Sequence, residues 1–122
     1  IYFIDKDPKA IDVLQKNISK LKIDNNDKTH IKIIKEDALK ALQDIKIVFD
    51  VVLIDPPYHS NVIEECLVTL KQYNLINFNS YIFAESSKKE NFNFDGFDLS
   101  DTKIYGKSKL TILKLSNSGS IE

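Results

Sequence analysis

The chain has 122 residues, of which 43% are hydrophobic and 29% are charged, and its formal net charge is −1. These values are ordinary for one soluble globular domain, and the overall charge gives no sign of a nucleic-acid partner. Cys66 is the only cysteine, which excludes an internal disulfide and a thiolate metal site. Without a long apolar segment or a leader, the sequence favours a cytoplasmic protein that is not inserted in a membrane.

The first predicted strand covers residues 1–4 and ends at Asp5. An acidic residue at such a position commonly binds a nucleotide ribose, because one carboxylate can accept hydrogen bonds from two vicinal hydroxyls. Asp7 and Pro8 then predict the start of a helix, with Asp7 as the N-cap. The helix ends near Lys22, and one apolar stripe is formed by Ile11, Leu14, Ile18 and Leu21.

A second strand is predicted at residues 31–34, followed by Glu36-Asp37-Ala38. Asp37 is well placed to N-cap the next helix. That helix would carry Ala38, Leu39, Leu42 and Ile45 on its apolar side.

The central stretch of the chain is residues 49–58, Phe-Asp-Val-Val-Leu-Ile-Asp-Pro-Pro-Tyr. Its apolar run predicts a strand that is buried on both faces of a parallel sheet and is ended by the two prolines. Asp55 therefore follows the carboxyl end of this strand, where open α/β sheets bind ligands. The Asp55 carboxylate and the Pro56 carbonyl can accept hydrogen bonds from an amine, while Tyr58 offers a ring for stacking. The plainer alternative is a strand that ends in a Pro-Pro turn with an exposed tyrosine.

After Tyr58, His59 is interpreted as a loop residue that touches substrate at most. A helix with an apolar stripe, a strand at residues 81–84 and a hairpin around Gly106 complete the pattern. The helical stripe consists of Ile63, Cys66, Leu67, Leu70 and Tyr73. Lysines near the hairpin either meet RNA phosphates or form an ordinary solvated surface: Lys88, Lys89, Lys103, Lys107 and Lys109.

Asp-Pro-Pro-Tyr at residues 55–58 resembles the motif of S-adenosylmethionine-dependent methyltransferases that act on exocyclic or amide nitrogens. The order of the strand ending at Asp5, the Glu-Asp-Ala at 36–38, this motif and the Tyr-Gly-Lys at 105–107 resembles the RsmD family. Members of that family are bacterial 16S rRNA guanine-N2 methyltransferases. The likeness runs from residue 1 to about Leu115.

The resemblance implies S-adenosylmethionine as cofactor, no metal, and 16S rRNA or an assembling small ribosomal subunit as partner. It places the ribose of the cofactor at Asp5 and its adenine amine at Asp37, which is compatible with capping by Asp37. The implied cofactor-binding residues are Asp5, Lys6, Asp37, Ala38 and Asp55. The implied catalytic residues are Asp55, Pro56, Pro57 and Tyr58.

The expected fold is an α/β, Rossmann-like methyltransferase sheet, mostly parallel, with an antiparallel hairpin at its C-terminal end. Residues 1–115 would form the catalytic domain and residues 116–122 a polar tail. The chain has no Met and only three glycines, none in a clustered loop. By resemblance, a strand and a Gly-rich turn would precede Ile1, and that first strand would lie between the strands ending at Asp5 and Asp55. We therefore expect a sheet that lacks its first strand and self-associates to complete its ladder.

Three other functions stay open. Adenine-N6 methyltransferases of nucleic acids share the Asp-Pro-Pro-Tyr motif, but those compared carry a target-recognition insertion that is absent here. Protein-glutamine methyltransferases have Asn at the position of Asp55. An inactive, nucleotide-binding fragment is the third possibility, because the Gly-rich turn is missing.

Overall fold

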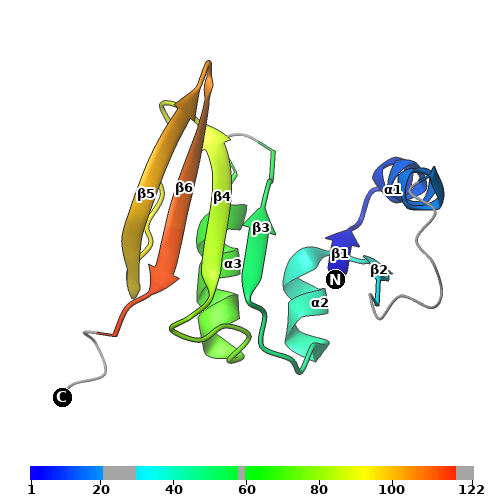
Figure 1. Cartoon of the computed structure of the whole chain (residues 1–122), viewed down its shortest axis with the longest axis horizontal. Coiled ribbons are helices and arrows are strands. Elements are labelled where there is room, and N and C mark those ends of the chain that lie inside the picture. Colours follow the sequence, from blue (N-terminus) through cyan, green and yellow to red (C-terminus); the bar gives the residue numbers. More distant parts are fainter. Residues whose placement is uncertain (21–29, 58–59, 118–122) are drawn as a thin grey trace. The chain divides into compact units, whose positions relative to one another are not determined.

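The computed structural model describes residues 1–20, 30–57 and 60–117, in which strands and helices alternate up to residue 87 and two further strands follow (Figure 1). The chain divides into two compact units, Ile1–Asp44 and Ile45–Glu122, and each is described by itself. The first contains β1 (Tyr2–Asp5), α1 (Pro8–Lys20), β2 (Lys32–Lys35) and α2 (Ala38–Asp44). The second contains β3 (Val51–Ile54), α3 (Val62–Gln72), β4 (Tyr81–Ser87), β5 (Phe97–Tyr105) and β6 (Ser108–Leu115).

In the first unit, β1 and β2 form a parallel pair whose register runs from Tyr2 opposite Lys32 to Asp5 opposite Lys35. Asp7 N-caps α1 through a 2.9 Å hydrogen bond from the Lys9 N–H to its Oδ1. Asp37 lies just before α2, and its Oδ2 accepts from the Lys40 N–H at 3.3 Å. Both carboxylates satisfy backbone donors that a helix start leaves without partners, so both predicted caps are confirmed.

In the second unit, four strands form a sheet in the order β3-β4-β6-β5. The β3–β4 ladder is parallel, whereas the β4–β6 and β5–β6 ladders are antiparallel. The predicted C-terminal hairpin is therefore confirmed, and with the parallel pairs β1–β2 and β3–β4 the sheet structure is mixed. Gly106 turns the hairpin with φ of +57°, a conformation that glycine adopts without steric cost.

The core of the second unit lies between α3 and one face of this sheet (Figure 1). Ile82 of β4 pairs with Leu113 of β6, and both side chains are fully buried. The predicted stripe of α3 is confirmed by four buried residues, Ile63, Cys66, Leu67 and Leu70. Tyr73 was expected to continue the stripe, and this prediction is wrong. Tyr73 is the C-cap and is exposed, because the helix ends there.

The end of α3 also fixes the start of β3. Asn74 adopts φ of +55°, the Asn74 N–H bonds to the Lys71 carbonyl at 3.3 Å, and the Leu75 N–H bonds to the Leu70 carbonyl at 2.9 Å. This is a Schellman-type helix end, and it turns the chain back toward the sheet. The Leu75 carbonyl then accepts from the Phe49 N–H at 2.8 Å, just before β3.

Three other predictions about the strands need correction or comment. β3 is not buried on both faces, because Leu53 is 76% exposed and Val51 is 56% exposed. Val51 and Leu53 alternate with Ile54, so they lie on the face of β3 opposite that buried residue, and β3 pairs with β4 alone within the described residues. β4 continues past the predicted residues 81–84 to Ser87, and Ser86 is a buried residue of this strand. β1 and β3 belong to different sheets in the described chain, as expected for strands that do not pair directly.

Candidate active site

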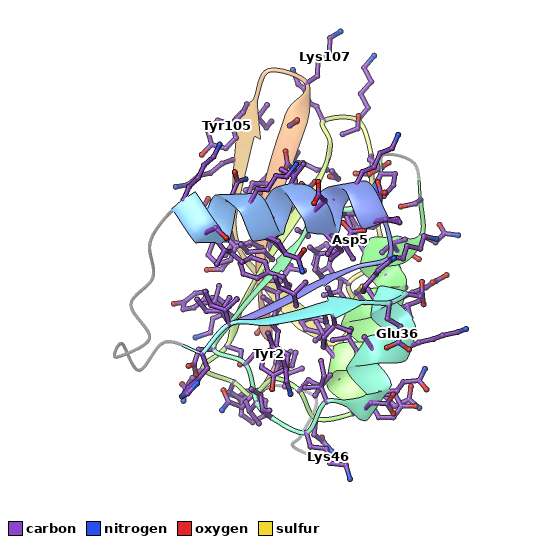
Figure 2. The ribbon with its side chains drawn as sticks, turned by 90° about the vertical axis from the view of Figure 1, so that its right-hand side faces the viewer. Tyr2, Asp5, Glu36, Lys46, Tyr105 and Lys107 are labelled. Carbon is purple, nitrogen blue, oxygen red and sulfur yellow. The ribbon has the colours of Figure 1, made fainter. Side chains whose placement is uncertain are left out.

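The predicted cofactor residues of the first unit gather at one edge of the β1–β2 pair. Asp5 is the last residue of β1, and Asp37 and Ala38 follow the end of β2. The carboxyl ends of the two strands are held together by a 3.1 Å hydrogen bond from the Glu36 N–H to the Asp5 carbonyl. Asp5 and Glu36 consequently lie at the same end of this pair (Figure 2). The structure therefore brings together Asp5, Lys6, Asp37 and Ala38.

The Asp5 side chain has a defined orientation although it is exposed. Its Oδ1 accepts a 2.9 Å hydrogen bond from the Asp7 N–H, in the turn that leads into α1. An ionised carboxylate offers about four acceptor sites. One bond to the backbone thus orients Asp5 and leaves it able to accept from two hydroxyl groups. Lys6, the next residue, is also exposed.

The second set of predicted residues follows β3 in the second unit. Ile54 is buried and pairs with Ala84, and it is followed by the exposed Asp55. Among the residues that the structure describes, no hydrogen bond or ion pair engages the Asp55 carboxylate. The Pro57 carbonyl accepts a 2.8 Å hydrogen bond from the Ser60 hydroxyl. Asp55 is thus a solvent-facing acceptor directly after the end of β3.

Tyr58 and His59 lie outside the described residues, so the predicted stacking ring and the loop histidine are not located. The residues at the end of β3 and those at the end of β1 belong to different units. Within each unit the predicted residues are adjacent, at the carboxyl ends of parallel strands.

Two contacts of the second unit have no clear signal in the sequence. The Ser60 hydroxyl donates to the Pro57 carbonyl. Ser80 is fully buried, and its Oγ donates to the Phe49 carbonyl at 2.6 Å and accepts from the Asn77 N–H at 3.0 Å. Ser80 thereby holds the chain that enters β3. The only sequence signal for this role is a serine directly before an apolar strand.

Other kinds of site were also sought in residues 1–20, 30–57 and 60–117. No group of three or more His, Cys, Asp or Glu side chains in these ranges is placed to hold a metal ion. None of the helices described there has the length and apolar character needed to cross a bilayer. A groove of about 580 Å³ lies between α3 and residues 93–97, and its lining includes Leu67, Val68 and Phe94 but none of the predicted site residues.

Carboxylates at the ends of parallel strands, helices between those strands and a final antiparallel hairpin define an α/β chain of the Rossmann-like methyltransferase type. A family model described as "Conserved hypothetical protein 95" matches residues 1–114. The chain belongs to this family, the RsmD family that its motifs resemble.

The chain is similar to several known proteins. It is 34% identical over 71 residues to an uncharacterised methylase of Rickettsia prowazekii, covering 57% of this chain and 30% of that protein. It is 31% identical over 88 residues to the ribosomal RNA small subunit methyltransferase D of Buchnera aphidicola, covering 71% of this chain and 44% of the relative. A solved structure of a conserved hypothetical protein from Streptococcus pyogenes is 25% identical, with a TM-score of 0.80, and covers 94% of this chain and 71% of that chain. The chain thus spans less than half the length of these two curated relatives.

Proposed function

We propose that the chain is the greater part of the catalytic domain of an enzyme that methylates the exocyclic N2 amine of a guanine in 16S rRNA. The observation that carries this proposal is Asp55-Pro56-Pro57 at the carboxyl end of β3, in a chain of the RsmD family. The name of the Buchnera relative, a ribosomal RNA small subunit methyltransferase, supports the substrate class.

When bound, S-adenosylmethionine would supply an electrophilic methyl group to the amine nitrogen and would leave as S-adenosylhomocysteine. The described residues fit the nucleoside part of this molecule. Asp5 presents a carboxylate with acceptor sites beyond the one used by the Asp7 N–H, and these suit the two ribose hydroxyls. Asp37 is half-buried at the end of β2, where it accepts from the adenine amine, and Lys6 and Ala38 line the same edge.

Asp55 accepts a hydrogen bond from the guanine amine and directs the nitrogen lone pair toward the methyl carbon. The second acceptor is the Pro56 carbonyl, next to the Pro57 carbonyl that accepts from the Ser60 hydroxyl. Tyr58 stacks on the base, which must leave its own stack to enter the site. These groups act through alignment and electrostatic preorganisation. The proton released by the methylated amine passes to solvent.

The test is transfer of a labelled methyl group from S-adenosylmethionine to small ribosomal subunits from cells lacking the gene. The whole product of the gene and the 122-residue chain are assayed side by side, and the modified nucleoside is identified by mass. N2-methylguanosine is the expected product. Methylated adenine, methylated protein or no product from either sample contradicts the proposal, and these outcomes correspond to the adenine-N6, glutamine and inactive-fragment alternatives.

A further inference from the structure

The hairpin of β5 and β6 extends beyond the strand that carries Asp55. The β3–β4 ladder ends at Ile54 opposite Ala84. The β4–β6 ladder continues with the pairs Glu85–Leu110, Ser86–Lys109 and Ser87–Ser108. Three further residues at about 3.3 Å each carry the hairpin roughly 10 Å past the end of β3. Figure 1 shows the turn between β5 and β6 projecting at the edge of the sheet where β3 and β4 end.

Two hydrogen bonds hold the hairpin turn against the segment that follows β4. The Lys88 N–H donates to the Lys107 carbonyl at 2.7 Å. The Nζ of Lys109 donates to the Glu90 carbonyl at 2.6 Å. The turn and the segment therefore form one surface, which we call the hairpin tip and define as residues 87–89 and 103–109.

The hairpin tip is strongly basic in a chain whose net charge is −1. Its ten residues include five lysines and no Asp or Glu, and the acidic Glu90 borders it. One of the five, Lys109, is half-buried and is engaged by the Glu90 carbonyl. The other four are exposed to solvent: Lys88, Lys89, Lys103 and Lys107. This concentration of one charge at one end of the sheet is the electrostatic pattern of a surface that meets phosphates.

The hairpin tip also exposes an aromatic ring. Tyr105 is 61% exposed, and it pairs with Ser108, which in turn pairs with Ser87. Lys103 and Tyr105 are two residues apart in β5, so their side chains lie on the same face of the hairpin. Figure 2 shows Tyr105 and Lys107 at the projecting end of the hairpin. Lysines alone would be enough to keep a hairpin soluble. An exposed aromatic ring among lysines suits a ligand that has both phosphates and flat bases.

We infer that the hairpin tip binds the RNA strand next to the target guanine, with Lys88, Lys89 and Lys107 on phosphates and Tyr105 against a neighbouring base. This inference rests on the proposed function and adds to it the surface that meets the substrate. Because the tip projects past Asp55 on the same edge, RNA bound there has its adjacent nucleotide near the end of β3. The lysines provide affinity that does not depend on sequence, and Asp55 acts only on the base that is turned into the site.

The test measures binding of unmodified 16S rRNA by the whole product of the gene at a series of salt concentrations. One variant combines Lys88→Gln, Lys89→Gln and Lys107→Gln, and a second carries Tyr105→Leu. The matched control combines Lys9→Gln, Lys20→Gln and Lys46→Gln, which removes the same charge from exposed positions elsewhere. A charge-retaining variant replaces Lys88, Lys89 and Lys107 by Arg. Affinity for S-adenosylmethionine, measured on each variant, reports that the protein is folded.

Each phosphate contact on a single strand contributes about 0.7 to the steepness of log affinity against log salt concentration. Loss of three contacts is therefore expected to reduce this steepness by about two. Tyr105→Leu is expected to weaken binding roughly five- to a hundredfold, the range for one stacked base. The control and the Arg variant should bind like the wild type. Equal slopes for the Gln variant and its control would overturn the inference. Methyl transfer by the wild type is scored separately, so the proposed activity can stand while the inference fails, or the reverse.

Discussion

Ile54 and Ala84 form the last pair of the parallel β3–β4 ladder, and the two chains then take different courses. After Ile54 the prolines end β3, whereas after Ala84 the chain stays in the sheet for three more residues, to Ser87. Asp55 therefore lies where the shorter strand β3 ends, and the basic hairpin tip extends farther out along the same edge of the sheet. The proposed chemistry at Asp55 and the proposed RNA binding at the tip would thus share one edge of the sheet.

Replacing Asp55 by Ala should abolish methyl transfer while leaving the affinity for S-adenosylmethionine nearly unchanged. The carboxylate is proposed to hold the substrate amine, so its loss removes an interaction needed for alignment in the transition state. We expect kcat to fall at least about a hundredfold, as for removal of one preorganised polar group. Asp50→Ala, an exposed carboxylate before the other end of the same strand, is the control. Equal losses of cofactor affinity and transfer in Asp55→Ala would contradict this role.

Replacing Asp5 by Asn should weaken cofactor binding and spare the fold. The amide oxygen can still accept from the Asp7 N–H, but the second oxygen becomes a donor and the charge is lost. We expect S-adenosylmethionine to bind roughly tenfold more weakly by calorimetry, since a hydrogen bond to a charged group contributes about 1.5–3 kcal/mol. kcat at saturating cofactor should change little. Asp12→Asn, on the exposed side of α1, should bind like the wild type, and an unchanged Asp5→Asn variant would remove Asp5 from the site.

Ser80→Ala should destabilise the second unit although it touches no predicted site residue. The substitution leaves the Phe49 carbonyl and the Asn77 N–H without the hydroxyl that now bonds to both. Both hydrogen bonds are part-buried and each contributes about 0.5–1.5 kcal/mol, so the free energy of unfolding should fall by about 1–3 kcal/mol. Denaturant unfolding measures the change. Asn79→Ala, one residue earlier and exposed, should stay within about 0.5 kcal/mol of the wild type. Similar values for both variants would show that Ser80 does not anchor β3.

The sequence predicts local features of this fold well, because their causes are local. Asp7 and Asp37 cap helices since each is followed by a helix start, and Gly106 turns a hairpin since its backbone needs positive φ. The position of β3 in the sheet was not predictable in the same way. The run Val51–Ile54 is apolar whether the strand is central or at an edge, and only pairing with distant residues decides between the two.

The candidate site likewise combines features that the sequence predicts with features that it does not. Adjacency of Asp5 and Asp37 follows from the parallel pairing of β1 and β2, which the alternation of strands and helices implies. The hydrogen bond from the Ser60 hydroxyl to the Pro57 carbonyl is not encoded by any pattern of residue types. The roles of Asp5 and Asp55 toward cofactor and substrate stay predictions, because they concern partners outside the chain.

Self-association through β3 is the last prediction, and it follows from the edge position of that strand. The described residues pair with β3 on one side only, and Leu53 is 76% exposed. An edge strand with apolar, unpaired backbone is a template for pairing with another chain. Sedimentation of the 122-residue chain should therefore show a mass that rises with concentration. Leu53→Lys should reduce this rise, because a charge on an edge strand opposes edge-to-edge pairing, whereas Val68→Lys on the exposed side of α3 should not. A monomer at every concentration, or equal effects of the two substitutions, would show that β3 does not mediate assembly.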